Sequence, residues 1–344
     1  MADAPKVSIV IPTHNRAALI GRAVRSALAQ SERDIEVIVV DDGSRDDSAA
    51  LLAAIGDPRL RVVRHDSNRG IPAARNSGLA AARGEWLAWL DSDDLARPRR
   101  IERQLRFLAR NPDIALAGSC AGMIRPDGRR RRAIRVPPFS TAQIEAWLLF
   151  RAPFQQSALI GRTAILRAYP YRAENPVCED LDVFLRVARD HRTANMAEVL
   201  VDRLSHPGQI TRTDDGAIDA RMAELLRPGL ERLGMAFDAA DLDRHICLAR
   251  PGRLGREASP AFLGWAEDWL RRLAVANEAS RAVDPAALRF AMSFLWLRAC
   301  LATAKRGGVG AVAGPLARSP LSAGLLAGEG RRWAASALWA AASR

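Results

Sequence analysis

Paired cysteines and long apolar runs are missing from this chain of 344 residues. The four cysteines lie far from one another in the sequence: Cys120, Cys178, Cys247 and Cys300. This spacing predicts neither a disulfide framework nor a Cys-x-x-Cys zinc site, and it favours a reducing compartment. No stretch offers the roughly 18 uninterrupted apolar residues of a membrane-spanning helix. The apolar run from Val7 ends at Pro12, so no signal peptide is expected. We expect a soluble protein, or at most one that rests on a membrane surface.

Two phosphate-binding fingerprints are absent as well. The sequence has no Gly-x-x-x-x-Gly-Lys-Ser/Thr motif, and no Gly-x-Gly-x-x-Gly follows its first apolar run. These absences argue against a P-loop nucleotidase and against an ordinary dinucleotide dehydrogenase. A nucleotide could still be held if a carboxylate bound its base or ribose and a metal ion bound its phosphates.

Lysine is scarce, although the formal net charge is +12: among 51 basic residues only Lys6 and Lys305 are lysines. The basic residues are spread along the chain, and the one dense run, Arg129 to Arg132, is typical of a solvated hairpin tip. Net charge alone suggests nucleic-acid binding, but no aromatic-basic recognition motif accompanies it. We expect no nucleic-acid partner, and a salt-dependent DNA shift assay would test this.

Apolar runs and helical patterns alternate through the amino-terminal third of the chain. Strands are predicted at residues 7–11, 36–40, 60–64 and 86–90, and helices at 17–29, 46–55 and 72–82. Short β-α-β connections of this kind predict a mainly parallel sheet with helices on both faces. The fold class is therefore α/β, and 344 residues suffice for one large domain or two smaller ones.

Polar residues follow every predicted strand. They are Thr13-His14-Asn15-Arg16, Asp41-Asp42, the stretch from His65 to Arg69, and Asp91-Ser92-Asp93-Asp94. The carboxyl ends of parallel strands open into the crevice where ligands bind. We therefore expect these side chains to converge on one rim of the sheet.

The acidic end of the 86–90 strand is the most informative of these sites. An interior strand can bury Trp86 to Leu90, but unpaired Asp91, Asp93 and Asp94 are costly to bury. Carboxylates in an Asp-x-Asp arrangement suit Mg²⁺ or Mn²⁺, which also bind substrate phosphates. An acidic helix N-cap would explain one or two of the three. A glycoside hydrolase with paired carboxylates would not explain the arrangement.

The remainder of the chain changes in character after about residue 215. Strands are predicted at 114–118, 133–136, 154–160 and 197–204, and an amphipathic helix begins near Glu179. Helices are then predicted at 217–233, 239–249, 260–276, 285–305 and 331–342, with a flexible loop at 307–330. This predicts a domain at 1–215, divided into halves 1–110 and 111–215, and a helical region at 216–344.

Together these motifs resemble family 2 glycosyltransferases of the GT-A fold. The resemblance is carried by residues 7–16, Val39-Val40-Asp41-Asp42-Gly43-Ser44, Asn68-x-Gly70, Ala74-Arg75-Asn76, Gly84-Glu85 and Asp91-Ser92-Asp93-Asp94. Their order and spacing match over residues 5–110, and the likeness continues more thinly to about residue 212.

The resemblance implies a nucleotide-diphosphate sugar donor and favours a UDP-sugar. It places Asp42 on the base and Arg75 near the ribose or diphosphate. The residues that it implies for donor binding are Pro12, Thr13, Asn15, Arg16, Asp42, Gly70, Arg75, Asp91, Ser92 and Asp93.

The resemblance also implies a divalent cation, Mn²⁺ or Mg²⁺. Asp93 would bind the metal, and Asp91 or Asp94 would hold a sugar hydroxyl or a metal-bound water. His206, in an Arg-x-x-His stretch, would supply a further metal ligand or a donor to phosphate, although a lone His before Pro-Gly is often a turn residue.

Glu179 and Asp180 are the implied catalytic pair. Acids in the first turn of a helix can simply favour the helix dipole, whereas the family places its general base in such a pair, normally at the second residue. Asp180 is thus the predicted base, which takes a proton from an acceptor hydroxyl as that oxygen attacks the anomeric carbon.

The predicted function is an inverting, metal-assisted glycosyltransferase that acts on a glycan or glycolipid acceptor. A catalytically silent GT-A module that serves as a binding or scaffolding partner is the alternative, and metal-dependent donor turnover separates the two. The expected location is cytoplasmic, with peripheral contact at the inner face of the membrane as an option.

Overall fold

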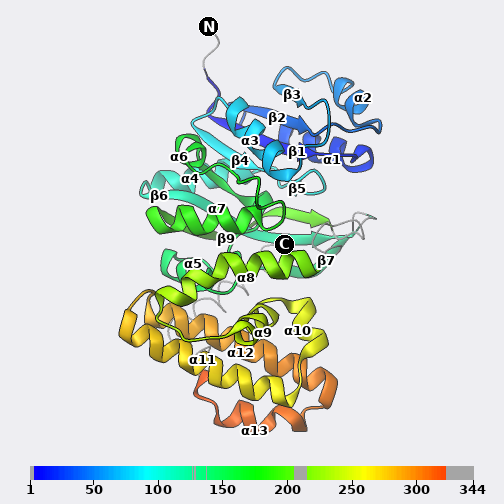
Figure 1. The fold of residues 1–344 in the computed structure, drawn as a ribbon. Helices are drawn as coiled ribbons and strands as arrows, with labels where there is room; N and C mark the ends of the chain where they lie inside the picture. Colours follow the sequence, from blue (N-terminus) through cyan, green and yellow to red (C-terminus); the bar gives the residue numbers. More distant parts are fainter. Residues whose placement is uncertain (1–3, 126, 128, 137, 205–214, 323–344) are drawn as a thin grey trace. The chain divides into compact units, whose positions relative to one another are not determined.

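Strands and helices alternate from the amino terminus up to β4 (Figure 1). The computed structural model describes residues 4–125, 127, 129–136, 138–204 and 215–322. The first elements are β1 (Val7–Thr13), α1 (Ala17–Leu28), β2 (Ile35–Asp41), α2 (Ser48–Ala53), β3 (Leu60–Arg64), α3 (Ile71–Ala81) and β4 (Trp86–Trp89). All seven were predicted from the sequence, with boundaries that differ by a few residues.

The first four strands form a parallel sheet in the order β3-β2-β1-β4. Side chains of alternating residues point to opposite faces. Ile20 and Val24 of α1 belong to the cluster of buried side chains on one face. On the other face α3 approaches so closely that a Cβ at Gly78 would lie 2.3 Å from the Val10 side chain. Because both faces are covered by helices, β1 and β2 read as continuous apolar runs.

The rest of the sheet has mixed strand directions. It continues from β4 through β8, β6 and β9 to β5, with β7 beside β6. The pairs β4–β8, β6–β8, β5–β9 and β6–β7 are antiparallel, whereas β6–β9 is parallel. The later elements are β5 (Leu95–Ala96), α4 (Arg100–Arg110), β6 (Ile114–Ile124), β7 (Arg130–Arg135), the 3₁₀ turn η1 (Gln156–Ala158), β8 (Ile160–Arg162), α6 (Thr163–Ala168), α7 (Glu179–Asp190) and β9 (Arg192–Leu204). The predicted α/β architecture is confirmed, but the sheet is mixed rather than mainly parallel: parallel pairing is found among β3, β2, β1 and β4 and between β6 and β9.

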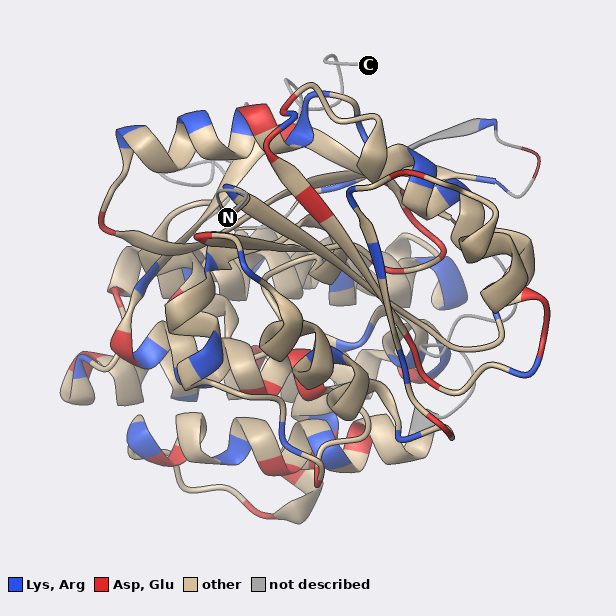
Figure 2. Ribbon diagram, turned by 90° about the horizontal axis from the view of Figure 1, so that it is seen from above, with Lys and Arg blue, Asp and Glu red and all other residues tan. Residues whose placement is uncertain are grey.

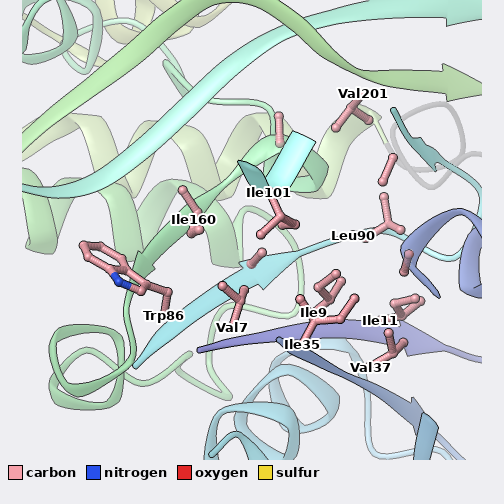
Figure 3. Close-up of a cluster of buried hydrophobic side chains, with 14 of the residues drawn as sticks. Val7, Ile9, Ile11, Ile35, Val37, Trp86, Leu90, Ile101, Ile160 and Val201 are labelled. Atoms are coloured by element: carbon pink, nitrogen blue, oxygen red, sulfur yellow. The ribbon is translucent and has the colours of Figure 1, made fainter. Parts of the chain in front are cut away.

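One apolar cluster joins the parallel strands to the later ones. Ile9, Ile11 and Val37 lie near Leu90 and Ile101 in Figure 3, and Ile160 and Val201 of later strands belong to the same cluster. Most of these side chains are fully buried. The cluster holds the end of β4 against both halves of the sheet, and so fixes the place where the acidic motif begins.

Two predicted segments fold differently. Residues 154–160 were expected to be a strand, but Gln156–Ala158 forms a 3₁₀ turn and β8 begins only at Ile160, because Ser157 turns inward to hydrogen-bond the acidic loop after β4. Residues 307–330 were expected to be a loop, yet α13 spans Gly310–Arg318. Gly308, at φ +81°, ends α12, and the alanines that follow favour a new helix. The helix predicted at 331–342 lies outside the described residues.

A second compact unit consists of residues 140–153 and the helices from residue 215 onward. Its elements are α5 (Thr141–Trp147), α8 (Asp215–Arg232), α9 (Ala239–Ala249), α10 (Pro251–Glu257), α11 (Pro260–Ser280), α12 (Pro285–Gly307) and α13. The predicted boundary near residue 215 thus omits one piece, since α5 packs on α12. Both strand-forming stretches, 4–139 and 154–204, belong to the first unit.

A buried histidine fastens this inserted segment to the helices. The Trp269 indole N–H donates to His245 Nδ1 at 3.0 Å, and His245 Nε2 lies 2.9 Å from the Leu149 carbonyl oxygen. The imidazole is therefore neutral, with its proton on Nε2. Burial lowers the pKa of His245 to about 4.

Helix α12 has the length and the apolar composition of a membrane span, with a mean hydropathy of 1.3 over its most apolar window. However, 61% of that window is buried inside the protein, and Leu295 and Trp296 are fully covered. These are the properties of a core helix. Several helices carry both acidic and basic residues (Figure 2).

Candidate active site

The carboxyl ends of the parallel strands meet along one edge of the sheet. The strand register pairs Thr13 with Asp41 and Asp41 with Arg64, and β4 runs parallel beside β1. The loops that follow these strands therefore share one rim. Asp91 and the residues after Thr13 and Asp41 belong to this rim, as the sequence pattern predicts.

The loop after β1 is tied to the loop after β2. Asn15, at φ +49°, donates its backbone N–H to Ser44 Oγ, and its Oδ1 accepts from the Arg45 backbone N–H. Pro12 and Arg16 are half-buried beside it, and Thr13 is buried. This region offers the predicted donor-binding residues on a loop whose backbone is already fixed.

Asp42 organises the loop that precedes α3. Its Oδ1 accepts from His65 Nδ1 at 2.7 Å and from the Arg69 backbone N–H at 2.9 Å, and its Oδ2 accepts from the Gly70 backbone N–H at 2.8 Å. A carboxylate oxygen can accept about two hydrogen bonds. Oδ1 of Asp42 therefore has both acceptor positions filled by described residues, whereas Oδ2 keeps one acceptor position to which a ligand N–H can donate.

The three aspartates after β4 have different surroundings. Asp94 is buried: its Oδ2 accepts from Ser157 Oγ at 2.6 Å, and its Oδ1 accepts from the Leu204 backbone N–H at 3.1 Å. Burial raises the pKa of Asp94 to about 7, against the opposing charge of Arg203. Asp94 thus connects the acidic loop to the end of β9, and Asp91 and Asp93 are the carboxylates that stay partly exposed.

Arg100 lies beneath the acidic loop and is fully buried. Its guanidinium donates to the carbonyl oxygens of Trp89 and Leu159 at 2.8 and 2.9 Å. Burial lowers the pKa of Arg100 to about 9, although Asp91 and Asp94 act in the opposite direction. Sequence patterns did not predict this role, because Arg100 is one of several arginines in a helix whose composition is typical of a surface helix.

Arg75 lies between Asp91, which follows β4, and Glu179, at the start of α7. Its side chain is only 6% exposed, and it contacts both Asp91 and Glu179. Burial alone would lower the pKa of Arg75, but Asp91, Glu179 and Asp180 raise it overall. The resemblance predicted Arg75 beside the ribose or diphosphate; here it is enclosed by protein groups. Tyr171, which lies against it, was not predicted from the sequence.

Glu179 and Asp180 open α7, directly after Cys178 in a left-handed conformation (φ +59°). Glu179 is buried, and its burial raises its pKa to about 7. Asp180 is half-buried, and its Oδ1 accepts from the Leu181 backbone N–H at 2.8 Å. Burial also raises the pKa of Asp180, with Arg75 opposing, so the helix dipole does not dominate its ionisation.

The residues at the rim fit a cation that is shared with a substrate. Among the described residues no group of three or more His, Cys, Asp and Glu side chains could hold a metal by itself. Asp91 and Asp93 nevertheless supply two partly exposed carboxylates two residues apart in the sequence. Mg²⁺ and Mn²⁺ sites commonly use one or two carboxylates and complete their shell with phosphate oxygens and water. His206 lies outside the described residues.

Comparison with known proteins decides the family. The family model described as glycosyl transferase family 2 matches residues 8–169. An uncharacterized glycosyltransferase of Rickettsia typhi, RT0329, is 30% identical over 217 residues, which cover 61% of this chain and 67% of that protein. The chain belongs to glycosyl transferase family 2. The resemblance carried by the motifs is thereby confirmed.

A more similar but shorter match is the succinoglycan biosynthesis protein ExoO of Rhizobium meliloti. It is 44% identical over 156 residues, which cover 43% of this family 2 chain and 44% of ExoO. The chain thus spans less than half of ExoO, and only 18% of the Rickettsia conorii glycosyltransferase RC0461 is covered.

Solved structures confirm the fold of this family 2 chain. TarS residues 1–349 from S. aureus, crystallised with UDP-GlcNAc, superpose with a TM-score of 0.56 at 18% sequence identity. The superposition covers 83% of this chain and 90% of the TarS fragment. At that identity the likeness establishes the glycosyltransferase fold, and the roles of individual residues must be argued from their geometry.

Proposed function

We propose that the protein is an inverting glycosyltransferase that moves a sugar from a nucleotide-diphosphate donor to a hydroxyl group of a glycan or glycolipid. The observation that carries the proposal is that the buried guanidinium of Arg75 contacts both Asp91, after β4, and Glu179, at the start of α7. Arg75 thus joins two groups of carboxylates in one site: one group suits a metal-bound diphosphate, and the other suits proton transfer.

In this proposal Asp180 is the general base. The acceptor oxygen attacks the anomeric carbon, the bond from that carbon to the diphosphate oxygen breaks, and the acceptor proton passes to Asp180. Asp91 and Asp93 would hold a divalent cation, which neutralises the charge that develops on the leaving diphosphate. One direct displacement inverts the anomeric centre.

A uridine donor is the first to test. Asp42 keeps one acceptor position at Oδ2, and TarS, which has the same fold, is known in complex with UDP-GlcNAc. The name of ExoO refers to succinoglycan biosynthesis, which supports a saccharide acceptor.

All four cysteines are free, in keeping with a cytoplasmic site of action; periplasmic recovery of the protein on cell fractionation would contradict that location.

The decisive experiment is a screen of nucleotide-sugars for nucleotide release with Mn²⁺ or Mg²⁺, with and without EDTA. We expect release from one donor class only, loss of release with EDTA, and a β-linked product from an α-linked donor by NMR. A retained configuration, or release that EDTA leaves unchanged, would refute the mechanism. Donor binding without any turnover would favour a silent binding module.

A further inference from the structure

The surroundings of Arg75 leave its guanidinium a single position. Its Nε lies 3.3 Å from Glu179 Oε1, and its Nη2 lies 3.3 Å from Asp91 Oδ1. The guanidinium carbon lies 5.3 Å from the centre of the Trp89 ring and 5.5 Å from that of Tyr171. Two carboxylates thus contact its edge while two aromatic rings enclose it. Arginine has the planar, delocalised cation that such an arrangement requires.

The aromatic wall is itself held in place from both sides of the site. Asn76, the residue after Arg75, donates its Nδ2 to the Tyr171 carbonyl oxygen at 2.7 Å and accepts from the Tyr171 N–H at 2.9 Å. The Tyr171 hydroxyl accepts from Gln156 Nε2 at 3.0 Å. Tyr171 precedes α7 in the chain, so these bonds tie the acceptor-side segment to α3.

Three carboxylates, those of Asp91, Glu179 and Asp180, act on the positive charge of Arg75. Two of its nitrogens are already engaged, and its Nη1 is buried without a hydrogen-bond partner among the described residues. A diphosphate would have to displace protein contacts to reach this group. Breaking such a pair by removing one partner leaves a buried charge without compensation.

We propose that Arg75 is a positioning residue that fixes the acceptor-side carboxylates, through Glu179, relative to the donor-side loop, through Asp91. This inference rests on the proposed function and deepens it. Arg75 does not bind the donor's diphosphate. It acts through Glu179, which sets the orientation of the first turn of α7 and so of the Asp180 carboxylate.

The bridge itself is tested in the ligand-free protein, independently of any activity. D91N and E179Q are combined, and the equilibrium constant for unfolding is measured in urea. Each single variant leaves Arg75 one of the two carboxylates that contact it, whereas the double variant leaves it neither. We expect the double variant to raise the equilibrium constant for unfolding about tenfold more than the product of the two single effects. In an R75Q background the combined effect of D91N and E179Q should equal the product of their separate effects to within about twofold. R75M repeats the test without the amide.

Independent effects of D91N and E179Q in the wild-type background would overturn the bridge. Asp91 and Glu179 also repel each other directly, and this repulsion would persist without Arg75. If R75Q and R75M both fail to fold, R75K takes their place in the cycle, because lysine keeps the charge but lacks the planar fork that reaches both carboxylates. Coupling that R75K leaves at its full size would overturn the bridge.

The role in positioning is tested by steady-state kinetics. R75Q should lower kcat by about a hundredfold while the donor KM and the dissociation constant of UDP stay within about threefold. A UDP affinity lowered tenfold or more would make Arg75 a diphosphate ligand and overturn the proposal. R61Q is the matched control, because Arg61 pairs with buried Glu36 at 2.8 Å, away from the rim; it should leave kcat and KM unchanged. Absence of turnover in the wild type with strong coupling in the cycle would refute the proposed function but leave the bridge standing.

Discussion

Neighbouring residues in the first turn of α7 have carboxylates in unlike surroundings. Glu179 is buried against Arg75, whereas Asp180 is half-buried and accepts a hydrogen bond from the Leu181 backbone N–H. A group that must take a proton from an incoming hydroxyl needs this accessibility. This difference supports the proposal that Asp180 is the base and Glu179 the anchor.

Replacement of Asp180 by Asn should lower kcat by about 10²–10⁴-fold and leave donor affinity nearly intact, because the base is removed without loss of volume. Glu179→Gln should lower kcat less, since it weakens only the anchor. Steady-state kinetics with the donor found in the screen, together with UDP titration calorimetry, would measure both. An Asp180→Asn enzyme at full speed would remove Asp180 from the mechanism.

Asp94 should make the metal-free protein less stable as the pH rises. Its pKa is raised by burial from 3.8 to about 7, so between these values the folded state binds a proton that the unfolded state does not. The free energy of unfolding contributed by this group therefore falls as pH rises through this window and is constant below it. Asp94→Asn, which can still accept from the Leu204 N–H, should abolish the effect.

Urea unfolding in EDTA at pH 5 and pH 8 measures this contribution. The wild type should lose about 2 kcal/mol more than Asp94→Asn between the two values. Glu36→Gln serves as control, because hydrogen bonds lower the pKa of Glu36 from 4.5 despite its burial. The free energy of unfolding that Glu36 contributes is therefore lost only below that value, outside the measured range. Equal pH slopes for wild type and Asp94→Asn would contradict the assignment.

The loops after β2 and β3 form one element of the site because their backbones touch. Gly43 has φ +68°, and a Cβ there would lie 2.4 Å from the Ser67 carbonyl carbon. The same β3–α3 loop is bound by Asp42 through Arg69 and Gly70. Glycine at position 43 is thus required both by its backbone conformation and by the contact.

Gly43→Ala should lower the free energy of unfolding by about 3 kcal/mol and weaken UDP binding, because the two loops must separate. Gly56→Ala is the matched control: Gly56 has φ +64°, but nothing lies within 4 Å of its added Cβ. Gly56→Ala should lower the free energy of unfolding by only about 1 kcal/mol, the cost of a left-handed conformation for a residue with a side chain. Urea unfolding and calorimetry would compare them, and equal losses would argue against the loop contact.

At the scale of the whole molecule, every described candidate site residue lies in the strand-containing unit. These residues run from Pro12 to Asp180, and none lies in the helical unit formed by 140–153 and the described residues after 214. Ligand binding should therefore stabilise the protein through the first unit, since a ligand that binds only the folded state raises its stability.

UDP with Mn²⁺ should raise the melting temperature, by an amount equivalent to about 2.7 kcal/mol at a ligand concentration of 100 Kd. EDTA should remove most of the shift, and Asp93→Asn should do the same without lowering the melting temperature of the free protein. Asp34→Asn, at an exposed carboxylate before β2, should retain the full shift. A shift in Asp93→Asn equal to that of the wild type would exclude Asp93 as a metal ligand.

The sequence alone determined the order of the elements and the chemistry of the rim. Apolar runs of strand length and the helical patterns between them fix β1 to β4 and α1 to α3, because backbone periodicity is a local property. Polar residues placed directly after strands predict a shared rim, because parallel strands end on the same side. Asp91 and Asp93 were found in this way, whereas Glu179 and Asp180, in the first turn of a helix, were singled out through the family resemblance.

Only the tertiary structure decided which of these charges are bound and which are accessible. Asp94 is buried and accepts hydrogen bonds from Ser157 and Leu204, which are 63 and 110 residues away along the chain. Arg100 supports the acidic loop from below, and Arg75 contacts Glu179 across 104 residues. The packing of 140–153 with the helical unit is likewise a contact between distant segments. Local patterns report the face on which a residue lies, whereas the partner that a buried charge finds depends on how distant segments pack.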